Sequence, residues 1–145
     1  MNNNLKAYES TSTLGLSQVD LILKVYDGAI AAFTEAAELY RKNDLNAGYE
    51  KMEKAKKFVT HLYTTLDPKN GGEIAERLGK IYAFVLSQTD IGQATKDLKI
   101  IDDNISVLKN VREGWQGLKE QQKNGAENKA ESGNNGAKPE FVTSA

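Results

Sequence analysis

The stretch "LILKVYDGAIAAFTEAAELY", Leu21 to Tyr40, predicts a long amphipathic helix that carries a glycine at its middle. Its apolar residues recur at spacings of three and four, a pattern typical of one buried helix face. The predicted core stripe consists of Ile22, Tyr26, Ala29, Ile30, Phe33, Ala36, Ala37 and Tyr40. Gly28 is unexpected there, because a glycine in a helix interior costs about 1 kcal/mol relative to alanine. The pair Asp27-Gly28 more often marks a turn.

A second apolar line on the same helix offers a reason for this glycine. The line consists of Leu21, Val25, Gly28, Ala32 and Leu39. Together the two lines cover an arc of about 220°, whereas a helix that buries one face needs little more than 100°. Small residues in the second line would let another backbone approach closely, which can offset the helix penalty of glycine. Two explanations stay open: this helix is more central than its neighbours, or it lines an apolar groove for an amphipathic partner.

Three further amphipathic segments follow the first helix. Asp44 is the predicted cap of the second helix, the stretch "DPKNGG" (Asp67 to Gly72) is a turn cluster, and the fourth helix begins near Asp97. The predicted inward residues are Leu45, Tyr49, Met52, Ala55, Val59, Leu62 and Leu66, then Ile74, Leu78, Ile81, Tyr82 and Val85, then Leu98, Ile101, Ile105, Leu108 and Trp115. No window alternates apolar and polar residues long enough to suggest a strand. We therefore expect an all-α fold, an antiparallel four-helix bundle over residues 17–121.

The two ends of the chain have the composition of flexible segments. Residues 1–16 are a predicted flexible N-terminal segment, and the capping pair Ser17 and Asp20 places the first helix start near Gln18. From Lys119 to Glu140 the sequence contains no Val, Ile, Leu, Met or aromatic residue, so it cannot bury a core. We predict a disordered C-terminal tail over residues 122–145 and assign the closing "PEFVTSA" to it.

Helices three and four also carry apolar residues outside their core stripes. These residues are Phe84 and Ile91 on the third helix and Ile100, Val107, Val111 and Leu118 on the fourth. In a bundle with one central core such outer lines have to be covered. Neighbouring helices of the same chain, a second copy or a foreign apolar segment could each cover them.

The sequence contains little that could support catalysis or cofactor binding. There is no cysteine and a single histidine, His61, so the ligands of a metal or haem site in a bundle are missing. Nineteen basic and twenty acidic residues leave no net charge to attract nucleic acid. No segment is apolar enough for membrane insertion, and the N-terminus lacks the apolar core of a secretory signal. We expect a cytoplasmic protein that is not an enzyme and has no cofactor, no metal and no nucleic-acid partner.

Three stretches of the chain resemble one known family. "LILKVYDGAI" (Leu21 to Ile30), "TLDPKNGGEIAERLGKIYAF" (Thr65 to Phe84) and "LKNVREGW" (Leu108 to Trp115) resemble the FliS family of cytoplasmic flagellin chaperones. The resemblance runs from about Ala7 to Leu118. It implies a four-helix bundle that binds the disordered C-terminal segment of flagellin in hydrophobic grooves. It also implies that the client is kept from polymerising prematurely and is delivered to the flagellar type III export apparatus.

The helix wheels, rather than the family, supply the predicted client contacts. These are Tyr8, Leu21, Val25, Gly28, Ala32, Ile100, Val107 and Val111. The resemblance adds that the N-terminal segment around Leu5 and Tyr8 covers a groove until the client displaces it. The sequence departs from the family late in the third helix, where "TDIGQ" (Thr89 to Gln93) is expected to weaken the helix end. The alternative function is a self-associating helical adaptor whose outer apolar lines are closed by homodimerisation.

Overall fold

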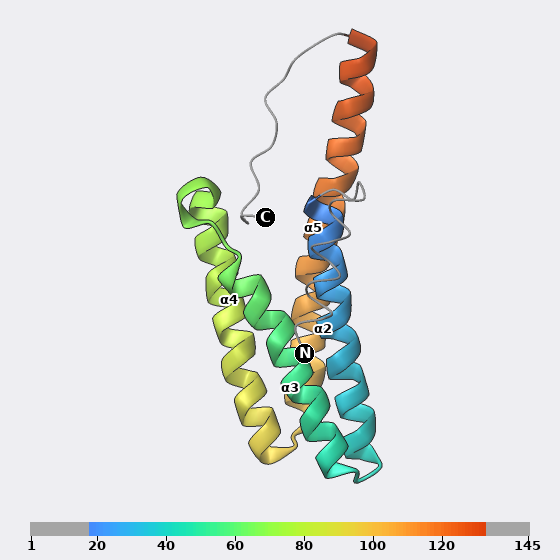
Figure 1. The fold of residues 1–145 in the computed structure, drawn as a ribbon, viewed down its shortest axis with the longest axis vertical. Helices are drawn as coiled ribbons and strands as arrows, with labels where there is room; N and C mark the ends of the chain where they lie inside the picture. Colours follow the sequence, from blue (N-terminus) through green and yellow to red (C-terminus); the bar gives the residue numbers. More distant parts are fainter. Residues whose placement is uncertain (1–17, 133–145) are drawn as a thin grey trace.

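The computed structural model describes the backbone of residues 18–132. Side chains are described up to Gln121, and beyond it only for Asn124. These residues form four helices: α2 (Gln18–Arg41), α3 (Leu45–Thr64), α4 (Pro68–Thr95) and α5 (Leu98–Ser132). Successive helices run in opposite directions, each packs against the next, and α5 returns to pack against α2 (Figure 1). This arrangement confirms the predicted all-α antiparallel bundle.

Aspartate caps begin the later helices. The Asp44 carboxylate accepts a hydrogen bond from the Ala47 amide at 3.4 Å, and the Asp97 carboxylate accepts one from the Lys99 amide at 2.9 Å. Both predicted helix starts are therefore confirmed. The first helix is described from Gln18 onward, and its predicted cap Ser17 lies outside the described residues.

The predicted turn cluster at Asp67 to Gly72 is mostly helical. Asp67 caps α4, Pro68 occupies its first turn, and the break comes only at Gly72, with φ 54° and ψ −132°. A side chain is strained at that backbone conformation, so the position requires glycine. The helix resumes after Gly72, with a first turn at 68–71 set apart from the rest.

The core lies along the bundle axis and largely follows the predicted stripes. Its largest fully buried side chains include Tyr26, Phe33, Met52, Leu62, Tyr82, Ile101 and Leu108. The prediction is wrong for three residues expected to face inward, because Leu45, Tyr49 and Ile74 are exposed. Leu45 and Tyr49 lie in the first turns of α3, and Ile74 follows the break in α4, so these residues are at element ends where less of the bundle surrounds them.

Helix α5 continues beyond the predicted end of the bundle at residue 121. It runs to Ser132 and in Figure 1 extends past the ends of the other helices, while the boundary between bundle and tail at residue 122 stays a prediction. Lysine, glutamate, glutamine and alanine have high helix propensity, and a helix already nucleated can add residues without a core to pack on. Residues 133–145, including "PEFVTSA", lie outside the described residues, as does the predicted N-terminal segment with Tyr8.

Candidate binding surface

The predicted groove along the first helix is already covered by the chain itself. Val25 and Ala32 are buried in the core. A Cβ placed on Gly28 would lie 2.6 Å from two ring carbons of Phe58, a residue of α3. The glycine is present because an aromatic ring lies against the α2 backbone, so the expectation of an open line at Val25, Gly28 and Ala32 is wrong. Of the two explanations for the wide apolar arc, the more central position of this helix is the correct one.

The second line of α5 has a different environment. Its predicted members Ile100, Val107 and Val111 are half-buried, and they lie on the side that faces α4. Asn104 donates a hydrogen bond to Oγ1 of Thr89 in α4 at 3.2 Å. The side chain of Ile100 also lies 3.3 Å from the Cβ position of Gly92. Val107 and Val111 follow Ile100 and Asn104 by seven residues, or two turns, and so share this face.

Helix α4 contributes two isoleucines to the same side. Ile81 and Ile74 precede Gly92 by eleven and eighteen residues, close to three and five whole turns. Ile81 is half-buried, and 61% of Ile74 is exposed. Half-buried Leu118 extends the line on α5 by two turns beyond Val111. We call the set Ile74, Ile81, Ile100, Val107, Val111 and Leu118 the α4–α5 strip.

An aromatic cluster lies in the core next to the strip. Trp115 donates its indole N–H to the Tyr26 hydroxyl at 3.2 Å, and the hydroxyls of Tyr26 and Tyr82 are hydrogen-bonded to each other. The two tyrosine rings are tilted by 54° with centroids 6.3 Å apart. Burial raises the pKa of Tyr82 to about 12 and that of Tyr26 far above its usual range, so both hydroxyls stay protonated near neutral pH. The cluster joins α2, α4 and α5.

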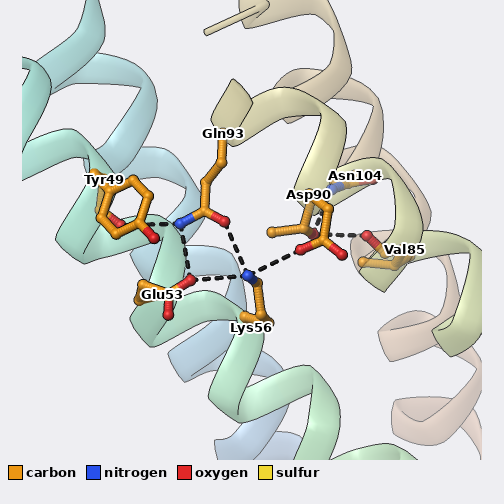
Figure 2. Close-up of polar contacts among 8 residues, drawn as sticks. Tyr49, Glu53, Lys56, Val85, Asp90, Gln93 and Asn104 are labelled. Atoms are coloured by element: carbon orange, nitrogen blue, oxygen red, sulfur yellow. Dashed lines mark hydrogen bonds and ion pairs between the residues drawn. The ribbon is translucent and has the colours of Figure 1, made fainter. Parts of the chain in front are cut away.

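The other side of α4 is closed against α3 by polar contacts (Figure 2). Lys56 Nζ lies 2.8 Å from Glu53 and 2.9 Å from Asp90, and it donates to Oε1 of Gln93 at 2.9 Å. The amide of Gln93 donates to Glu53 at 2.9 Å and to the Tyr49 carbonyl at 3.4 Å. The hydrogen bond from Lys56 is the main reason why the pKa of Glu53 is lowered. Around Asp90 and Gln93 this side is therefore occupied by polar contacts to α3.

These contacts correct the expectation that the helix weakens at Thr89 to Gln93. Helix α4 continues to Thr95, and Thr89, Gly92 and Gln93 are all buried. A Cβ placed on Gly92 would lie 3.3 Å from side-chain carbons of Ile100 and of Met52. Gly92 lowers the helix propensity, but its small size is needed for this packing.

The remaining predicted residues have separate positions. Leu21 is half-buried on α2 and does not belong to the strip, and Tyr8 lies outside the described residues. Phe84 and Ile91 are exposed on the face of α4 that points away from the core, as their predicted position off the main seam implies. Ile74 and Ile81 were missed as candidates because both were assigned to the core stripe. Their seven-residue spacing matches that of Ile100 and Val107 and is the signal that could have paired the two lines.

The described residues indicate no metal site and no membrane span. Among the side chains that the structure describes, no group of histidine, cysteine, aspartate or glutamate could bind a metal ion. None of the described helices combines the length and apolarity needed to cross a membrane. What the geometry does offer is an aliphatic strip, partly open, on one side of a helical bundle.

Known proteins resemble this chain over most of its length. A family model described as flagellar protein FliS matches residues 1–122. The flagellar secretion chaperone FliS of Salmonella typhimurium is 28% identical over 118 residues, which cover 78% of this chain and 87% of that protein. The protein of the same description from Vibrio cholerae is 23% identical over 119 residues, which cover 79% and 88%. A crystal structure of a bacterial flagellar chaperone shares the fold, with a TM-score of 0.69 and 21% identity over 81% of this chain and 98% of that one.

Proposed function

This chain belongs to the FliS family of flagellar secretion chaperones, and from that premise we propose that it binds the disordered C-terminal segment of flagellin in the cytoplasm. Bound in this way, the segment cannot polymerise prematurely and is delivered to the flagellar type III export apparatus. The family is one of chaperones and not of enzymes.

The α4–α5 strip is the observation that supports this proposal. A segment that folds on binding loses a few kcal/mol in ordering, and burial of apolar surface at about 25 cal/mol per Å² has to exceed that loss. Six aliphatic side chains that are exposed or only half-buried can supply such surface. Their spacing of about two turns suits an amphipathic helix laid along α4 and α5. We therefore draw the client surface along this strip and omit Val25, Gly28 and Ala32.

Calorimetry with a peptide from the C-terminus of flagellin of the same source tests the proposal. Ile74→Lys changes an exposed residue of the strip, and Ile91→Lys is a matched control because 45% of Ile91 is exposed on the same helix but outside the strip. We expect Ile74→Lys to weaken peptide binding at least tenfold and Ile91→Lys to change it less than twofold. Both variants should melt as the unchanged protein does, because neither residue is buried.

The absence of any heat with the unchanged protein at high micromolar peptide would contradict flagellin binding. Equal weakening by the two variants would instead mean that the client binds elsewhere on α4.

The alternative of a self-associating adaptor is weakened for the outer apolar line of the first helix. A homodimer that buries Gly28 would need the position that Phe58 already occupies. Light scattering over a range of concentrations tests what is left of this alternative: a dimer that persists on dilution would support it.

A further inference from the structure

The two halves of α4 are attached to the bundle very differently. In residues 73–81 only Ala75 and Leu78 are buried. The ion pairs described for this half join residues of the helix itself, Arg77 with Glu73 at 2.7 Å and Lys80 with Glu76 at 3.6 Å. Pairs of this kind stabilise the helix but do not hold it to its neighbours.

Residues 82–95 contact three other helices. Tyr82 is hydrogen-bonded to Tyr26 of α2, and Thr89 accepts a hydrogen bond from Asn104 of α5. Asp90 and Gln93 contact Lys56 of α3 (Figure 2). Five residues of this half are buried: Tyr82, Val85, Thr89, Gly92 and Gln93.

The beginning of α4 is loosely connected as well. At Gly72 the backbone leaves helical geometry, and apart from its chain neighbours and the backbone of its own helix nothing lies within 4 Å of the Cβ position. In Figure 1 the end of α4 that starts at Pro68 stands apart from α2 and α5. Such a segment, with few buried contacts and a break at the end remote from residues 82–95, belongs to the low-stability end of a fold.

We propose that residues 73–81 form an arm that swings away from α5 while residues 82–95 stay anchored. The swing widens the α4–α5 strip between Ile81 and Val111 and lets an amphipathic helix enter. On the arm itself, opening exposes the apolar surface of buried Ala75 and Leu78 and of half-buried Ile81, which packs against the core. The role in client entry rests on the proposed function, whereas the motion itself does not.

Hydrogen exchange of the free protein tests the motion. The comparison uses amides of residues 77–81 and 85–93, because the first amides after the break lack helical acceptors in any case. We expect residues 77–81 to exchange at least tenfold faster than residues 85–93. Equal protection of the two segments would overturn the arm, whether or not a client binds.

A covalent lock tests the role of the arm in client entry. The chain has no cysteine, so a Leu66→Cys/Gly79→Cys pair can be joined by a short thiol cross-linker without side reactions. A Leu66 methyl carbon lies 3.6 Å from the Cβ position of Gly79, which makes the two sites neighbours. We expect the cross-link to slow exchange of residues 77–81 to the level of residues 85–93. It should also lower the association rate constant of the flagellin peptide at least fivefold.

The same double variant without the cross-linker is the control, and it should bind the peptide as the unchanged protein does. Unchanged association after cross-linking would overturn the role of the arm in entry. If the peptide binds neither the locked nor the unlocked protein, the proposed client is wrong, and the exchange experiment still decides whether the arm exists.

Discussion

At the scale of single residues, Gly28 shows how a helix wheel can find a real constraint and assign it to the wrong partner. The wheel indicates that a small residue is needed on that line. It does not show that the neighbour is the Phe58 ring of the same chain. Phe58 lies beside the predicted stripe of the second helix rather than within it. The apolar periodicity therefore does not predict that Phe58 packs against α2.

The expected effect of changing Gly28 is reversed by this contact. From the sequence, Gly28→Leu should leave the bundle folded and abolish client binding; from the structure, any side chain at this position collides with Phe58. We expect Gly28→Ala to destabilise the protein by about 1–3 kcal/mol, as overpacking usually does. Gly114→Ala is the control, because nothing but its chain neighbours and the backbone of its own helix lies within 4 Å of its Cβ position, and it should stabilise by up to about 1 kcal/mol. Urea denaturation measures both, and equal stabilisation by the two changes would contradict the close contact.

At the scale of the helices, the ends were predictable where a local signal marks them. Asp44 and Asp97 are caps, and capping depends on residues within one turn. The packing partners were not predictable, since an apolar excess on one helix does not name the helix that covers it. The line Ile100, Val107 and Val111 was therefore found, and its counterpart Ile74 and Ile81 on α4 was not.

The attachment of α4 through Tyr82 predicts a loss of stability in alkali. The folded pKa of Tyr82 is about 12 against 10.0 for an ordinary tyrosine, so between these values the unfolded chain releases a proton that the native protein retains. Stability is therefore fully present below pH 10 and falls as the pH rises towards 12. We expect Tyr82→Phe to make this decline shallower in urea titrations at each pH. Tyr63→Phe, at an exposed site, should leave the decline unchanged. Identical slopes for the two variants would contradict a role of Tyr82.

At the scale of the whole molecule, we expect the bundle to fold without the residues that follow it. The family model ends at residue 122, and within the described part of α5 the core residue nearest its end is Trp115, with Leu118 packed against the core. We expect deletion of residues 122–145 to leave the melting temperature unchanged. The deleted segment contains no Val, Ile, Leu, Met or aromatic residue before Phe141, so it has little apolar surface to bury. Calorimetric melting of the two chains measures this. A decrease of more than about 4 °C, close to 1 kcal/mol for a domain of this size, would show that the segment stabilises the bundle.

Trp115 gives the protein a built-in optical probe. It is the chain's one tryptophan, and its indole N–H donates a hydrogen bond to the Tyr26 hydroxyl. That hydroxyl is also hydrogen-bonded to Tyr82, the first residue of the anchored half of α4. Its emission spectrum and its quenching by small solutes thus report on the environment beside Tyr82, where the proposed arm meets the anchored half, without an attached dye. A stopped-flow fluorimeter can follow that environment in real time as a client is added.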